Sequence, residues 1–352
     1  MHNQVSYLDC SNEVTAVPKS FAHQKSWLGA QIKTTDWLVP VGAAALDEIH
    51  SLAALIENND FEANHPADAT LPDLADSFSM PHCKKLFADV KEIVDNGVGF
   101  AVADKLPTDS FSAETMLKVF WLLGQLIDQP VSQKYCGQMI YDVRNTGVAF
   151  GYGVRGSVTN VELNFHTDNA FGKAPPDYVG LYCRHPAKEG GISRFCSLYA
   201  LHDQIANSHP DVLARLYQPM FYDRQKEHAD GAPAVTWAPY FSWRTDHNGQ
   251  QRLRARANTS LVRKGYEVAG IDLEADLQHA LDTVDQISQQ DHFWFEAALE
   301  KGQVQYLNNQ ETGHYRSEFT DYDETHKKRH LYRLWHRRDG HWSYDGLDPQ
   351  QA

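Results

Sequence analysis

The chain has 352 residues, of which 42% are hydrophobic, and its formal net charge at pH 7 is −14. This length suits one large domain or two ordinary ones with a substantial core. The acidic balance argues against nonspecific binding to nucleic acid or to an anionic membrane, because the phosphates of both would repel the chain. We therefore expect a small-molecule substrate as the partner, and leave a homo-oligomer open.

The cysteine usage and the hydrophobic pattern indicate a cytoplasmic protein. The five cysteines are scattered, with no C-x-x-C pair, so neither a disulfide framework nor a structural zinc site is expected. No apolar stretch approaches the ~20 residues that cross a membrane. The N-terminus also lacks a basic region followed by an apolar one, so no signal peptide is expected.

The first part of the chain carries helical patterns. Apolar side chains recur at helical spacing over 43–57, 83–94 and 112–128, and 99–102 is typical of a short buried strand. The intervening residues 58–82 are acidic and contain proline, which favours a loop. We expect residues 1–94 to form a helical or irregular segment packed on a core domain of residues 95–352.

From about residue 138 the pattern changes to short strands and turns. Strands are expected at 178–183, 192–195, 252–262, 293–296 and 304–307, with one helix over 272–288. Many short strands with few long helices indicate a mainly β fold with helices (α+β), namely a sandwich or jelly roll that carries an N-terminal helical layer.

The tripeptide His166-Thr167-Asp168 is the strongest functional signal. Three His-x-acid tripeptides occur in the chain, and chance alone predicts roughly two, so the motif by itself means little. Here, however, it ends a segment in which Val161, Leu163 and Phe165 alternate with Glu162, Asn164 and His166. Two imidazoles and one carboxylate on such a polar strand face would hold a divalent metal with open positions. The alternative is an exposed polar face without metal.

A third ligand must come from elsewhere in the chain, and His314 follows a strand-like segment. An unliganded surface histidine is the ordinary alternative. Residues 329–335 then place Arg329 and Arg333 on one face of a strand, roughly 13 Å apart. Two guanidinium groups near a metal could capture carboxylates through paired hydrogen bonds, whereas the alternative is a solvated basic edge strand.

Taken in order, several segments of the chain resemble the iron(II)- and 2-oxoglutarate-dependent dioxygenases of the taurine dioxygenase/clavaminate synthase-like superfamily, which also holds γ-butyrobetaine hydroxylase. The resemblance covers roughly 95–338. It rests on 97–100, 162–171, 175–181, 190–193, 308–314 and 329–335.

The resemblance implies a double-stranded β-helix (jelly-roll) core with His166, Asp168 and His314 as the ligands of Fe(II). It also implies that 2-oxoglutarate and O2 are cosubstrates, with Ser193 and Arg329 contacting 2-oxoglutarate. One departure is Tyr315, which stands beside His314 where many relatives have glycine.

Six polar residues are candidate substrate contacts, each with a structural alternative because polar groups at strand ends often only satisfy the backbone. They are Arg333, Asn164, Glu162, Asn169, Arg155 and Arg256. A pocket with both signs of charge predicts a small polar, amino-acid-like substrate. The resemblance implies that this substrate is oxidised, most simply by hydroxylation of a C–H bond. Three alternatives stay open: desaturation, cyclisation or epoxidation on the same scaffold, a non-catalytic sensor, and a hydrolytic zinc site.

Overall fold

The computed structural model describes residues 5–12, 25–58, 65, 67, 68, 70–73, 79–151, 153–246 and 249–348. The helices in this part of the chain are α1 (Ala43–Glu57), α2 (Pro81–Asn96), α3 (Ala113–Gly124), α4 (Leu198–Ser208), α5 (Pro210–Leu216), α6 (Thr259–Ala269) and α7 (Ala275–Ser288). The first nine strands are β1 (Tyr7–Asp9), β2 (Leu38–Val39), β3 (Phe100–Ala103), β4 (Gln129–Val131), β5 (Tyr141–Val143), β6 (Leu163–His166), β7 (Tyr178–His185), β8 (Glu189–Gly190) and β9 (Ser193–Ser197). The others are β10 (Pro219–Asp223), β11 (Val235–Pro239), β12 (Phe241–Thr245), β13 (Gln251–Ala255), β14 (Trp294–Ala297), β15 (Val304–Asn308), β16 (Thr312–Arg316), β17 (Phe319–Thr320) and β18 (His330–Arg337).

Two β-sheets form the core and carry the site. The larger sheet has the strand order β2-β3-β15-β7-β18-β4, with β5 also paired to β18, and the smaller has the order β14-β9-β16-β6. Phe100 on β3 stacks on Phe195 on β9 with ring centroids 4.1 Å apart, so the inner faces of the two sheets pack directly together. The expected α+β fold with a jelly-roll core is confirmed.

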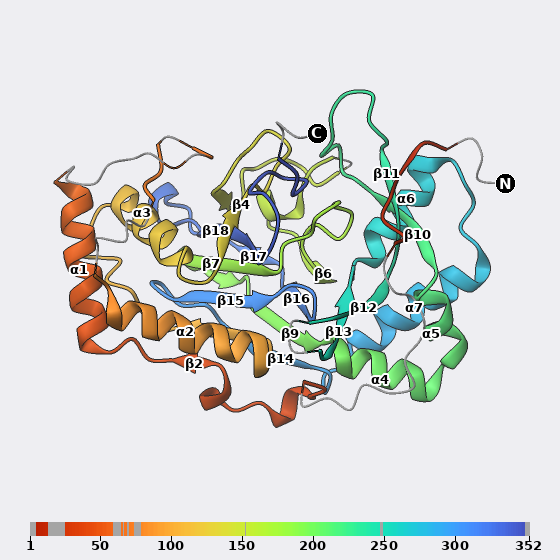
Figure 1. Cartoon of the computed structure of the whole chain (residues 1–352), viewed down its shortest axis with the longest axis horizontal. Coiled ribbons are helices and arrows are strands. Elements are labelled where there is room, and N and C mark those ends of the chain that lie inside the picture. Colours follow the sequence, from red (N-terminus) through yellow and green to blue (C-terminus); the bar gives the residue numbers. More distant parts are fainter. Residues whose placement is uncertain are drawn as a thin grey trace.

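The N-terminal helices cover the larger sheet on the left of Figure 1. The helices α1 and α2 match the predicted ranges 43–57 and 83–94 closely, because each buries one apolar stripe. The predicted helix 112–128 ends earlier, at Gly124. An added Cβ at Gly124 would lie 2.7 Å from Leu334 Cδ1, so glycine allows α3 to approach β18 closely.

A second group of helices, α4 to α7, lies beside the hairpin β12–β13 on the right of Figure 1. The expected strand over 252–262 is wrong in its second half. The strand β13 ends at Ala255, and the Asn258 side chain accepts a hydrogen bond from the Leu261 backbone N–H at 3.0 Å. This cap starts α6 at Thr259, since it satisfies one of the otherwise unpaired N–H groups of the first turn.

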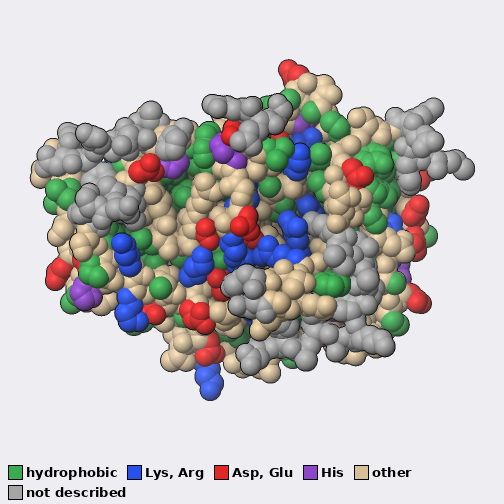
Figure 2. Space-filling model, viewed as in Figure 1, with side chains coloured by type: hydrophobic (Ala, Val, Ile, Leu, Met, Phe, Trp, Pro, Cys, Tyr) green, Lys and Arg blue, Asp and Glu red, His purple; other side chains and the backbone are tan. Residues whose placement is uncertain are grey.

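The described helices include none that is both long and apolar enough to traverse a membrane. On the face drawn in Figure 2, Lys and Arg side chains lie interleaved with Asp and Glu, so the net charge of −14 does not form one acidic surface there.

Candidate active site

Two adjacent strands bring the three predicted metal ligands together. His166 ends β6, His314 lies in the middle of β16, and the two residues are directly paired in the sheet, with ring centroids 4.2 Å apart. Asp168 follows β6, and its Oδ1 lies 3.6 Å from His166 Nε2 and 3.7 Å from His314 Nε2. One ligand atom from each residue falls within 4.8 Å of the others, a spacing suited to a single metal ion.

The hydrogen bonds of His166 and Asp168 leave one atom of each side chain, Nε2 and Oδ1, available to bind a metal. His166 Nδ1 contacts the Asn164 carbonyl oxygen at 2.8 Å, so it carries the proton and Nε2 presents its lone pair. Asp168 Oδ2 accepts hydrogen bonds from Arg333 Nη1 at 2.9 Å and from Trp335 Nε1 at 2.8 Å. Only Oδ1 of the carboxylate then faces the two imidazoles.

The protonation states also fit a divalent cation. Burial alone would raise the pKa of Asp168, but the Arg333 charge and the two histidines hold it well below its usual value. Burial and the neighbouring His166 lower the pKa of His314 to about 4. Near neutral pH the site therefore offers an ionised carboxylate beside a neutral His314 imidazole, as metal binding requires.

Two residues that sequence reasoning missed hold the ligands in place. Asn309 accepts from the Asp168 backbone N–H at 2.7 Å and donates to the Asp168 carbonyl oxygen at 2.9 Å. Gln133 is fully buried, and its Oε1 accepts from Arg333 Nε at 2.9 Å. Its Nε2 donates to the Arg333 carbonyl oxygen at 2.6 Å, which fixes the guanidinium that holds Asp168. Asn309 stands in a quoted motif, but nothing in the sequence around Gln133 signals this contact.

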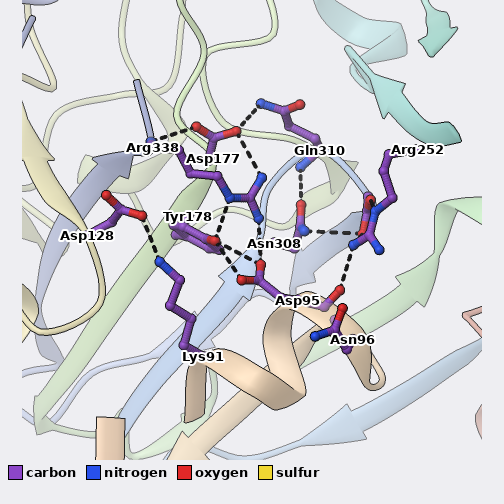
Figure 3. A network of polar contacts seen from close by, with 12 residues as sticks. Lys91, Asp95, Asn96, Asp128, Asp177, Tyr178, Arg252, Asn308, Gln310 and Arg338 are labelled. Atoms are coloured by element: carbon purple, nitrogen blue, oxygen red, sulfur yellow. Dashed lines mark hydrogen bonds and ion pairs between the residues drawn. The ribbon is translucent and has the colours of Figure 1, made fainter. Parts of the chain in front are cut away.

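A polar network fixes the turn between β15 and β16 that carries Asn309 (Figure 3). Within this turn, Gln310 Nε2 donates to Asp177 Oδ1 at 2.8 Å. Arg338 links Asp177 to Asp95. Its backbone N–H donates to Asp177 Oδ2 at 3.0 Å, and its Nη2 donates to Asp95 Oδ1 at 2.5 Å. Tyr178 also donates to Asp95, at 2.8 Å. Helix α2, β7 and β18 thereby position the turn that precedes His314.

The indole of Trp335 should tune metal affinity without touching the metal. We expect Trp335→Phe, which removes the donor to Asp168 Oδ2, to weaken metal binding by about 10- to 100-fold, as is typical for a lost partner of a ligand. Titration of the metal-free protein with Mn²⁺ measures this change. Trp294→Phe, on β14 of the smaller sheet, is the matched control. Equal affinities for Trp335→Phe and the unaltered protein would contradict this role.

A cavity of about 320 Å³ is bordered by two of the three triad residues, His166 and Asp168. Five of the six predicted substrate contacts border it, namely Arg155, Glu162, Asn164, Asn169 and Arg333. The cavity also reaches the N-terminal turn of α6 through Asn258 to Leu261, a segment for which a strand was expected. The sixth residue, Arg256, is absent from the lining.

Arg256 instead supports the loop after Asp168. Its Nη1 donates to the carbonyl oxygens of Ala170 and Gly172 at 2.9 and 2.8 Å, and its side chain is buried. Arg256, predicted as a substrate contact, therefore positions the loop that contains Ala170 and Gly172.

A β-bulge changes the face of Glu162. In the pairing of β6 with β16, His166 opposes His314 and Leu163 opposes Arg316, so two residues of β6 stand opposite Tyr315 alone. Leu163 consequently faces the same side as His166, so the predicted alternation does not continue before the bulge, although Glu162 still borders the cavity. The Glu162 carboxylate accepts a hydrogen bond from the Tyr315 hydroxyl at 2.5 Å.

Two further predicted substrate contacts, Arg155 and Asn169, already have partners within the protein. Arg155 Nη2 forms an ion pair with Glu227 at 2.9 Å, and its Nη1 donates to the Gln133 carbonyl oxygen at 3.1 Å. Asn169 adopts a φ of 54°, in the left-handed region that asparagine tolerates, and its Oδ1 accepts from the Tyr344 hydroxyl at 2.9 Å.

The two predicted cosubstrate contacts, Ser193 and Arg329, are not among the residues that line the cavity. Ser193 begins β9, and Arg329 directly precedes β18. The Arg329 side chain is buried, and burial lowers its pKa to about 10. Among the described residues, its Nη1 has no hydrogen-bond partner and no carboxylate lies within ion-pair distance. A buried guanidinium without an anion is costly, so this position suits a carboxylate from a ligand.

Comparisons with known proteins agree with this geometry. The family model described as "Taurine catabolism dioxygenase TauD, TfdA family" matches residues 68–335, and so begins before the motifs recognised in the sequence. FR-33289 synthase from Streptomyces rubellomurinus is 27% identical over 259 residues, which are 71% of this chain and 72% of the relative.

Solved structures share the fold at low sequence identity. An asparagine oxygenase in complex with Fe(II), 2S,3S-3-hydroxyasparagine and succinate has a TM-score of 0.61 at 18% identity. The non-heme iron oxygenase OrfP in complex with Fe and alpha-ketoglutaric acid has a TM-score of 0.58 at 13% identity. In both cases the match covers 86% of this chain and 94% of the solved chain. With most of its length matched by the family model, the chain belongs to the TauD/TfdA family of dioxygenases.

Proposed function

We propose that the protein is an Fe(II)- and 2-oxoglutarate-dependent dioxygenase that hydroxylates a C–H bond of a small, polar, amino-acid-like metabolite. His166, Asp168 and His314 would hold the iron, and Arg329 with Ser193 would hold 2-oxoglutarate. The observation that carries the proposal is the orientation of Asp168, whose Oδ2 is occupied by Arg333 and Trp335 while Oδ1 faces both histidines. Two imidazoles and one oxygen leave positions open for a chelating cosubstrate and for dioxygen.

The bound iron would couple the oxidative decarboxylation of 2-oxoglutarate to the activation of dioxygen. In sum, 2-oxoglutarate, O2 and the substrate give succinate, CO2 and the hydroxylated product. The protein's own part is orientation and exclusion of water. Phe171, Leu163 and Trp335 supply apolar walls of the cavity, while Arg155 and Arg333 supply charge. This division of roles suits a substrate that is anchored by a polar group and presents a C–H bond to the metal.

The test is release of succinate from 2-oxoglutarate by the Fe(II)-loaded protein across a panel of metabolites, with the product mass recorded. Hydroxylation adds one oxygen atom to the substrate, whereas desaturation and cyclisation remove two hydrogen atoms. Turnover that is independent of O2 and of 2-oxoglutarate would overturn the proposal in favour of a hydrolytic metal site. Binding of metal and 2-oxoglutarate without any turnover would favour the sensor alternative.

The charges around the cavity predict which part of an amino acid matters most. The guanidinium carbons of Arg155 and Arg333 lie 5.6 and 4.9 Å from the centroid of the Tyr141 ring, so two cations share one wall. The Glu162 carboxylate is engaged by Tyr315. Arg155 and Arg333 are also paired, with Glu227 and Asp168, but Arg155 Nε is a buried donor without a hydrogen-bond partner among the described residues. We therefore expect recognition to depend more on the carboxylate of the substrate than on its amino group. The solved complexes of asparagine oxygenase with 2S,3S-3-hydroxyasparagine and of OrfP with (3S)-hydroxy-L-Arg support an amino-acid-like class.

We accordingly expect free amino acids or related acids to stimulate succinate release above the uncoupled background. Converting the carboxylate of an active compound to a carboxamide should reduce stimulation at least about tenfold, the equivalent of one charge-assisted hydrogen bond. N-acetylation of the same compound should reduce it less. The comparison uses initial rates of succinate release. Stimulation by neutral apolar compounds alone would contradict this prediction and leave the metal assignment intact.

A further inference from the structure

Arg316 is a second buried arginine near the predicted cosubstrate site, and the sequence analysis assigned it no role. It lies two residues after His314 on β16, so both side chains point to the same side of the sheet, about 7 Å apart along the strand. Across the sheet Arg316 is directly paired with Ser193 on β9. Paired residues place their side chains on the same face, so Arg316 and Ser193 are neighbours on the face that carries the metal ligands.

The guanidinium of Arg316 is only partly satisfied. Its Nη2 donates to the carbonyl oxygens of Thr159 at 3.0 Å and Gly156 at 3.5 Å, and to that of Val161. Its Nε and Nη1 are buried and have no hydrogen-bond partner within the described part of the chain. No described carboxylate lies within ion-pair distance of Arg316 either. Three carbonyl groups thus accept from Nη2, while the two donor nitrogens Nε and Nη1 have no acceptor among the described residues.

Arg316 and Arg329 lie close together. The guanidinium carbon of each is 5.0 Å from the centroid of the Phe319 ring, and neither has a carboxylate partner among the described residues. Like charges that share a buried site repel, and each also loses hydration. An anion that accepts from both would relieve the two costs together, because charge-assisted hydrogen bonds are the strong ones.

We infer that Arg316 and Arg329 together bind the distal carboxylate of the 2-oxo acid, with Ser193 beside them. The inference rests on the proposed function and extends it to a residue outside the predicted site. A five-carbon dicarboxylate chelating the metal beside His314 would extend along β16 by about the two-residue step, roughly 7 Å, that separates His314 from Arg316. The same arginine holds the segment 156–161, whose Gly156 and Ser157 line the substrate cavity. Cosubstrate binding and the shape of that cavity wall are therefore linked through Arg316.

A pair of ligands separates direct contact from a merely structural role. Affinities of 2-oxoglutarate and of 2-oxopentanoate, which has no distal carboxylate, are measured by calorimetry on the Fe(II)-loaded protein without oxygen. We expect Arg316→Gln to weaken the binding of 2-oxoglutarate at least about tenfold, as for one lost charge-assisted hydrogen bond. Binding of 2-oxopentanoate should stay within about twofold, because it never contacts this arginine. Arg316→Lys keeps the charge, so its affinity for 2-oxoglutarate should lie between those of Arg316→Gln and the unaltered protein.

The control is Arg194→Gln, which removes an arginine from the outer face of the same sheet, where Arg194 pairs with Glu296. It should leave both affinities unchanged. Equal weakening of the two ligands by Arg316→Gln would assign Arg316 to the loop alone and overturn the inference, as would unchanged binding of both. Failure of the unaltered protein to bind either 2-oxo acid would instead refute the proposed function, so the two failures are distinguishable.

Discussion

Replacing His314 by alanine is expected to abolish metal binding and turnover while leaving the fold largely intact. His314 supplies one of only three protein ligands, so metal affinity should fall by more than the roughly 10- to 100-fold that losing a supporting residue costs. Its Nδ1 has no hydrogen-bond partner among the described residues, and its Nε2 faces the Asp168 carboxylate. The substitution therefore removes little that holds the sheet together, in contrast to Asn309 or Gln133, which hold backbone groups.

Metal content after loading and succinate release measure the effect, and circular dichroism reports the fold. His166→Ala should behave in the same way, because the two histidines occupy paired positions on β6 and β16. His292→Ala, at an exposed histidine outside the triad, is the control and should retain both metal and activity. Retention of iron and turnover by the His314→Ala protein would remove His314 from the proposed triad.

The parts of the site that were predictable from the sequence are those with a local signal. His166 and Asp168 stand two positions apart at the end of a strand-like segment, so their proximity follows from the chain itself. His314 has no such signal, and only the order of motifs along the chain identified it. The helices α1 and α2 were predictable because each keeps one apolar stripe at a constant period over at least 15 residues.

Errors arose where a single residue changes the local geometry. One extra residue in β6 reverses the face of Glu162, and alternation alone carries no mark of a bulge. At Asn258, the side chain caps a helix within a segment that alternates like a strand, so capping prevails over periodicity there. Gln133 reaches Arg333 across 200 positions of sequence, a contact that only the folded sheet creates.

Replacing Arg329 by alanine is expected to raise the apparent requirement for 2-oxoglutarate at least about tenfold while metal binding is retained. The guanidinium is buried and has no carboxylate partner among the described residues, so a ligand carboxylate would gain charge-assisted hydrogen bonds worth about 1.5–3 kcal/mol each. Arg333→Ala, at an arginine four positions further along the chain on β18, is the matched comparison. Because Arg333 holds Asp168 Oδ2, the Arg333→Ala variant should bind the metal more weakly. Its affinity for 2-oxoglutarate should fall only as a consequence of the lost metal. Mn²⁺ titrations measure the loss of metal affinity, and the dependence of succinate release on 2-oxoglutarate concentration measures the loss of cosubstrate affinity. The reverse ranking, with Arg329→Ala losing metal and Arg333→Ala losing only 2-oxoglutarate affinity, would exchange the two roles.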